Sequence, residues 1–205
     1  MLTAKSQKDA TDLLTGNVPT TWQTKWEGPE NPTMWIRLVT KKAVALLSWT
    51  QRMQSKTLLA QPVNLSDLFH PETFLNALRQ KSARALKIAI DELKLVSTFE
   101  HGKIGNGLAI QLEGLWLQGS AFDGKRLSDI KESNSSSELV NLPPCFVAWT
   151  GRSDADIYPV NQIAETPVYH TLDREKLLCT LMVPNNGEAS IRTISGAAIF
   201  LQGSD

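Results

Sequence analysis

Two cysteines and three histidines are the residues of this sequence whose side chains are best suited to nucleophilic catalysis or metal binding. A cysteine beside a histidine, such as Cys145 or Cys179 with His170, would form an activated nucleophile. Both cysteines, however, stand in apolar runs that are typical of strands, and a thiol buried in such a strand stays protonated and inert. We therefore predict no catalytic residue in this chain.

Signatures of bound groups are also incomplete. No two of the histidines are at metal-ligand spacing, and the cysteines form no C-x-x-C pair. The glycines of residues 102–107 resemble a phosphate-binding loop, but a strand-like alternation follows them where a nucleotide fingerprint requires a helix. We predict neither a metal nor a cofactor bound by this chain, and structural roles for His70, His101 and His170.

The composition is that of an ordinary globular protein rather than a disordered, collagen-like or disulfide-rich one. Its 205 residues are 41% hydrophobic and carry a formal net charge of +0. Residues 1–95 hold 13 basic and 8 acidic side chains, whereas residues 96–205 hold 8 and 13. Neither part is basic enough for a nucleic-acid surface, and no apolar run is long enough to cross a membrane. No secretory leader is recognisable at the start, which favours a cytoplasmic location and reduced thiols.

The first 95 residues carry the periodicity of helices. A short polar helix is expected over residues 3–14, and a long one begins at Asn31-Pro32 and ends by Pro62. Apolar residues of the long helix recur every three or four positions and predict a single core-facing stripe. That stripe consists of Trp35, Val39, Ala43, Leu46, Trp49 and Met53. A further helix begins at His70-Pro71 and is expected to stop before Asp91, because the helix dipole disfavours acids at a C-terminus.

After residue 93 the apolar period changes to two, which predicts strands. The candidate strands are residues 93–99, 108–112, 115–117, 145–150, 167–172, 177–183, 190–194 and 197–201. A change of phase at Gly114 predicts a β-bulge there. We therefore predict an α+β fold, with a helical subdomain over residues 1–95 and a small antiparallel β-barrel or sandwich over residues 96–205.

Four basic residues on the third predicted helix are candidates for an interface with another part of a larger protein, although such runs are usually solvated. They are Arg79, Lys81, Arg84 and Lys87.

Of the six tryptophans, only Trp116 and Trp149 fall in predicted strands, which is too few for a stacking platform. An exposed groove containing both would favour a stand-alone β-domain that binds a peptide or a glycan. Burial of both rings would count against that alternative.

Collinear blocks over most of the sequence resemble the C-terminal domain of dynein heavy chains. Residues 68–93 read LFHPETFLNALRQKSARALKIAIDEL, where the family has an aromatic–Pro step, a helix reading FL-x-A-x-x-Q-x-x-AR and then S-I-D-x-L. The blocks LWLQGSAFD (115–123), LPP (142–144), TPVY (166–169) and GAAIFL (196–201) follow in the family's order. Phe122 and Thr166 stand where the family usually has Trp and Cys. WEGPE (26–30) and LFHP (68–71) are most similar to the cytoplasmic dynein of intraflagellar transport.

This resemblance implies a non-catalytic cap that follows the last AAA+ module of a motor ring. ATP and Mg²⁺ would then be bound by the parent heavy chain, a microtubule motor, and not by this part of it. The implied partners are the AAA+ ring of the same polypeptide and, through it, microtubules, other dynein subunits and intraflagellar transport complexes. The implied location is the cytoplasm, the cytoskeleton and the cilium or flagellum. We expect the four basic residues to lie against the ring.

Overall fold

The structure is a computed structural model that describes residues 4–15, 17–19, 32–104, 108–130, 138–151 and 162–201. The chain divides into two compact units, Met1–Lys56 and Thr57–Asp205. This division falls earlier than the predicted boundary at residue 95. The reason is that the strand β1 (Val63–Asn64) and the helix α4 (Pro71–Leu86) contact strands of the sheet and belong to the same unit as the sheet.

The first unit contains two described helices, α1 (Ala4–Leu14) and α3 (Pro32–Gln54). Proline at the first position of α3 suits a helix start, because the N–H that it lacks would have no partner inside the helix. The predicted stripe lies on α3, but Trp35, Leu46 and Met53 are 41%, 38% and 61% exposed. Within the first unit, these three residues therefore do not face a core, in contrast to the prediction. Helical periodicity identifies an apolar face, but it does not say what covers that face.

The second unit begins with β1, the short 3₁₀ helix η1 (Leu65–Asp67) and α4. As predicted, α4 starts at Pro71 and ends before the acidic pair, which lies in a second 3₁₀ helix, η2 (Ile90–Glu92). Lys87 closes α4 in the left-handed conformation (φ 58°), and its N–H donates to the carbonyl of Ala83. This C-terminal cap satisfies a carbonyl that the helix itself leaves open.

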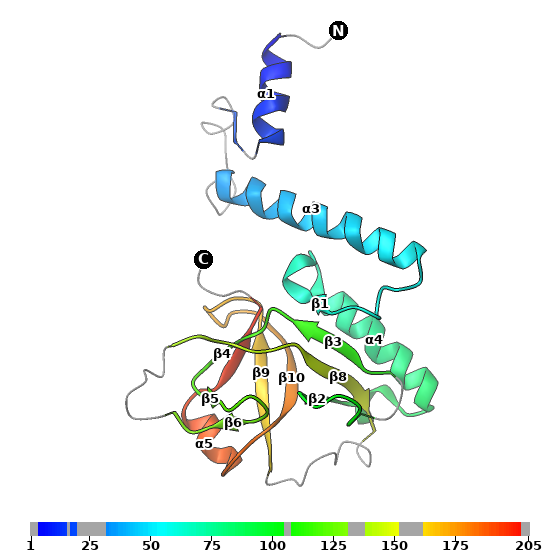
Figure 1. Ribbon diagram of the computed structural model, residues 1–205, viewed down its shortest axis with the longest axis vertical. Coiled ribbons are helices and arrows are strands. Elements are labelled where there is room, and N and C mark those ends of the chain that lie inside the picture. Colours follow the sequence, from blue (N-terminus) through cyan, green and yellow to red (C-terminus); the bar gives the residue numbers. More distant parts are fainter. Residues whose placement is uncertain are drawn as a thin grey trace. The chain divides into compact units, whose positions relative to one another are not determined.

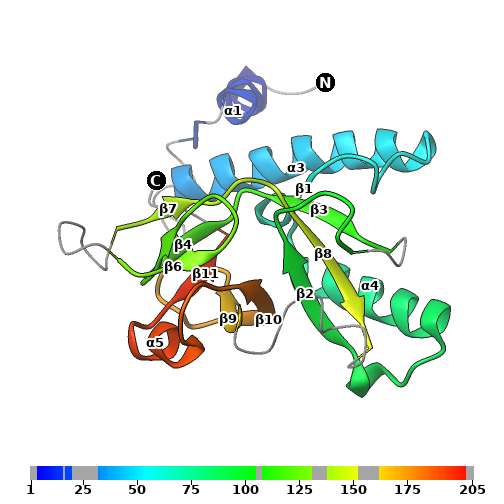
Figure 2. The same ribbon diagram turned by 60° about the horizontal axis from the view of Figure 1, so that its bottom comes forward.

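Among the described residues, nine strands form one mixed sheet in the order β1-β3-β8-β2-β10-β9-β11-β4-β7, and β5 pairs with β6 (Figures 1 and 2). Most neighbours are antiparallel, whereas β1/β3, β2/β10 and β9/β11 are parallel. The sheet stays open, with β1 and β7 as its edges, so the α+β prediction is confirmed as a sandwich-like form rather than a closed barrel. The strand bounds are β2 Lys94–Thr98, β3 Ile110–Glu113, β4 Trp116–Gln118, β5 Ala121–Phe122, β6 Leu127–Ser128, β7 Val140–Asn141, β8 Cys145–Thr150, β9 Ile163–Tyr169, β10 Leu177–Pro184 and β11 Ala198–Phe200.

Two local predictions in the second unit are wrong. Gly114 (φ +71°) does not form a bulge inside one strand but separates β3 from β4, which pair with different neighbours. Residues 190–194 are not a strand but belong to the helix α5 (Ala189–Ile194). In α5 the apolar Ile191 and Ile194 are exposed, whereas Arg192 is buried. A prediction based on apolar alternation would have buried the isoleucines instead.

Candidate functional site

The two thiols lie on strands of the sheet, as predicted, and neither is in a disulfide. Cys145 on β8 is buried, and loss of solvation raises the pKa of its thiol to about 12. Cys179 on β10 is half-buried, and burial raises the pKa of its thiol as well. A thiol whose pKa is raised is a weak nucleophile at neutral pH. The structure therefore offers no activated cysteine among the described residues.

Because the pKa of the Cys145 thiol is raised, we expect the free energy of unfolding to decrease at alkaline pH. An unfolded thiol ionises near pH 9.0, whereas the folded thiol ionises near pH 12, so the unfolded state loses its proton first. We expect the free energy of unfolding to fall between pH 9 and pH 12, by at most about 1.4 kcal/mol per pH unit from this residue. Urea unfolding at several pH values measures the slope. Cys145→Ala should remove this contribution, and an unchanged slope in that variant would contradict the assignment.

Neither a metal site nor a membrane span is found in the part of the protein that the structure describes. No cluster of three or more His, Cys, Asp or Glu side chains there has the arrangement of a metal site. None of the described helices combines the length and the apolar character that crossing a bilayer requires.

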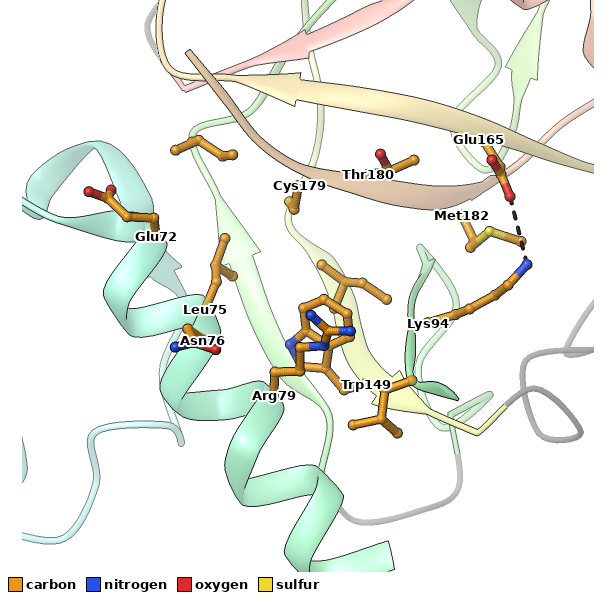
Figure 3. Close-up of a pocket in the computed structure, with 13 residues that line it drawn as sticks. Glu72, Leu75, Asn76, Arg79, Lys94, Trp149, Glu165, Cys179, Thr180 and Met182 are labelled. Atoms are coloured by element: carbon orange, nitrogen blue, oxygen red, sulfur yellow. Dashed lines mark ion pairs between the residues drawn. The ribbon is translucent and has the colours of Figure 1, made fainter. Parts of the chain in front are cut away.

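A pocket of about 380 Å³ lies between α4 and the strands β2, β8, β9 and β10 (Figure 3). Arg79 extends from α4 across this pocket, and its guanidinium carbon lies 5.1 Å from the centre of the Trp149 ring on β8. Arg79 Nη2 donates to the carbonyl of Ile90 at 2.7 Å, which ties α4 to η2. The guanidinium is therefore held in place by one hydrogen bond and by the indole face.

The other charged side chains at the pocket occur as ion pairs. Lys94 Nζ on β2 lies 3.7 Å from Glu165 Oε1 on β9. Glu72 Oε1, in the first turn of α4, lies 3.1 Å from Lys176 Nζ. A hydrogen bond from its own backbone N–H, and then the contact with Lys176, hold the pKa of Glu72 below its ordinary value. Arg79, in contrast, forms no ion pair with any described carboxylate.

The four basic residues that the sequence groups together do not share one environment. Arg79 is half-buried and turned into the pocket, whereas Lys81, Arg84 and Lys87 are exposed. Three of the four basic residues are thus solvated, and the fourth, Arg79, is half-buried in the wall of the pocket.

Trp116 and Trp149 are both half-buried. They lie on β4 and β8, between which β2, β10, β9 and β11 stand in the sheet order. The indole of Trp149 faces the guanidinium of Arg79. The single exposed aromatic groove that would favour a stand-alone binding module is therefore not seen among the described residues.

A buried polar cluster around Arg192 of α5 was not foreseen from the sequence. The Arg192 side chain is 3% exposed and donates from Nε to Asn185 Oδ1 at 2.7 Å, from Nη1 to Asp129 Oδ1 at 2.8 Å and from Nη2 to the carbonyl of Asn186 at 2.8 Å. This fork fastens α5 to the end of β10 and to the segment after β6. The one signal for this cluster in the sequence is an arginine among apolar residues. Without the fold, that pattern does not show whether the arginine is buried or exposed.

Comparison with known proteins agrees with the resemblance seen in the sequence. The family model for the C-terminal domain of the dynein heavy chain matches residues 1–201. Over 98% of the present sequence, the identity is 38% to cytoplasmic dynein 2 heavy chain 1 of Tripneustes gratilla and 36% to that of Homo sapiens. Over 93% of it, the identity is 24% to the ciliary dynein beta chain of Tripneustes gratilla.

The 205 residues span 5% of the length of the cytoplasmic dynein 2 relatives. The family match extends across both compact units of the structure. The protein described here belongs to the family of C-terminal domains of dynein heavy chains and is similar to the cytoplasmic dynein 2 members.

Proposed function

We propose that this chain is a non-catalytic domain of a dynein motor heavy chain that braces the AAA+ ring. In this role it modulates ATP-driven, minus-end-directed movement on microtubules during retrograde intraflagellar transport. ATP and Mg²⁺ act in the ring and not in this domain. The partners are the ring itself and, through the heavy chain, microtubules, other dynein subunits and intraflagellar transport complexes. The place of action is the cytoplasm, the cytoskeleton and the cilium or flagellum.

The observation that carries this proposal is the exposed apolar stripe of α3, in a sequence that is 36–38% identical to much longer motor polypeptides. Trp35, Leu46 and Met53 are exposed on the same side of one helix. An apolar stripe of this kind is typical of a helix that is covered in a larger assembly. The three solvated cations of α4 supply a second, electrostatic contact surface in the second unit.

Motility of the whole heavy chain tests the brace. Reversing Arg84 to Glu together with Lys81 and Lys87, or introducing Leu46→Asp on the stripe of α3, should change the velocity or run length on microtubules by roughly twofold or more, because contacts with the ring are lost. Single-molecule tracking with saturating ATP gives both quantities.

Two control variants change exposed residues elsewhere. Val44→Asp alters an apolar residue that lies about 200° around α3 from Leu46, since each helical residue turns by about 100°. Lys125→Glu reverses an exposed cation between β5 and β6. Both should move at the wild-type velocity. Wild-type velocity and run length in all the stripe and α4 variants would rule out the brace.

A further inference from the structure

The pocket between α4 and the sheet carries one unbalanced charge. Its two lysine–glutamate contacts neutralise each other in pairs, whereas Arg79 has no carboxylate partner among the described residues. The charge is also partly removed from water, because the Nε atom of Arg79 is buried and has no hydrogen-bond acceptor. A cation in such a place is stabilised by an anion that enters the same pocket.

A neighbouring polar atom of the pocket is unsatisfied as well. Trp149 Nε1, which like Arg79 Nε is a donor, is buried without a hydrogen-bond partner. Buried polar atoms in native proteins nearly always have partners, so unsatisfied ones that gather around a single pocket point to a missing occupant. Figure 3 shows the Arg79 side chain beside the Trp149 ring, and Leu75 and Cys179 line the same pocket.

The remaining wall of the pocket is apolar and includes Leu93, Leu95 and Met182. A volume of about 380 Å³ lies near the lower end of the range for small-ligand sites and accommodates side chains rather than a large cofactor. The occupant that suits these walls has a carboxylate for Arg79 and methylene or methyl groups for the leucines. An aspartate or glutamate with an apolar neighbour in a polypeptide segment meets both requirements.

We propose that the pocket receives an acidic side chain from a segment of the same heavy chain outside these 205 residues, with its carboxylate on Arg79. This inference rests on the proposed function, because it assigns the chemistry of one ring segment that the domain contacts. The relatives supply the length of polypeptide that it needs, since this domain spans only 5% of them. Arg79 is thus an anchor inside the pocket, and the exposed cations of α4 lie outside it.

Zero-length cross-linking of the whole heavy chain tests the anchor. Arg79→Lys places a primary amine near the guanidinium position, and a water-soluble carbodiimide joins an amine only to a carboxylate that touches it. Peptide mass spectrometry should then reveal a link from position 79 to an acidic residue outside this domain. The Lys176–Glu72 contact at 3.1 Å is an internal control for reactivity at the pocket. The native Lys125, an exposed amine between β5 and β6 and outside the proposed contact surfaces, gives the background.

Two results would overturn the anchor. One is a link from position 79 only to acids within residues 1–205, including Asp154 and Asp156, which lie outside the described residues. The other is no link from position 79 while the Lys176–Glu72 link forms. If links from Lys41 or Lys81 to the ring persist in that second case, the anchor fails and the brace stands. If those links are also absent, both proposals fail.

A second measurement needs no amine at position 79. Arg79→Glu repels a carboxylate and should empty the pocket, so that Cys179 in its wall is alkylated by a maleimide roughly fivefold faster in the whole heavy chain. Lys125→Glu serves as the matched control, because it reverses an exposed cation outside the proposed contact surfaces, and it should leave the rate unchanged. Equal rates in the wild type and in Arg79→Glu would also overturn the anchor. A thermal unfolding curve for each variant shows whether the fold is retained.

Discussion

Gly119→Ala is expected to destabilise the protein by about 2–5 kcal/mol, one of the two largest effects that we expect from a single substitution. Gly119 follows β4 with φ +76°, a left-handed conformation that costs residues with a Cβ atom about 1–2 kcal/mol. An added Cβ would lie 2.8 Å from the carbonyl oxygen of Ser195 and 2.9 Å from the nitrogen of Ala197. These are backbone atoms of the turn between α5 and β11, so they cannot move aside as a flexible side chain would. Urea unfolding of the 205-residue protein measures the loss.

Gly124→Ala separates the two contributions to that loss. Gly124 also has a positive φ, +99°, but no atom lies within 4 Å of the position of its added Cβ. This control should therefore show only the backbone cost, about 1–2 kcal/mol. Equal losses for the two variants would mean that β4 and the α5–β11 turn do not approach each other as the structure describes.

Arg192→Leu is the second substitution with a large expected effect, a loss of about 2–5 kcal/mol in the free energy of unfolding. The change removes all three hydrogen bonds of the guanidinium and keeps most of the apolar volume. It leaves the side-chain oxygen of Asn185, a residue that is 0% exposed, without its donor, and it also frees the carbonyl of Asn186, a residue that is exposed. Leaving the buried Asn185 oxygen unpaired costs about 1–3 kcal/mol, and the loss of the other two hydrogen bonds from a charged donor adds to this. Denaturant unfolding measures the change.

Asp129→Asn shows which contact of Arg192 matters. The Asp129 side chain is 71% exposed, so water replaces the lost charge and the cost should stay below about 1 kcal/mol. Arg174→Ala, at an exposed arginine that donates to Gln118 and to the carbonyl of Gly196, should also cost little. If Asp129→Asn were as damaging as Arg192→Leu, the surface ion pair rather than the buried Asn185 oxygen would hold α5.

Local signals in the sequence predicted the elements that have clear ends. Pro32 and Pro71 mark the starts of α3 and α4, and the acidic pair at residues 91–92 marks where α4 must already have stopped. Alternating apolar residues predicted β2, and apolar runs predicted β8 and β10. The resemblance to the family rested on similar local runs, and the family match confirmed it.

Features that depend on partners distant in sequence were not predictable in the same way. The pocket joins Arg79 to Trp149, which stand 70 positions apart, and no periodicity in either segment refers to the other. The misread strand at residues 190–194 has the same origin, because α5 depends on what Arg192 meets near residues 129 and 185. The apolar stripe of α3 was predicted, but its exposure was not. An amphipathic pattern identifies an apolar face, and it does not show which surface packs against that face.

The edges of the open sheet affect whether copies of this domain aggregate when many of them lie close together. Its outermost strands, β1 and β7, are each only two residues long. A strand edge invites pairing with a neighbouring molecule through its unused N–H and C=O groups, and a very short edge offers too few of them to nucleate a fibril. The domain can thus keep an open sheet and still resist aggregation.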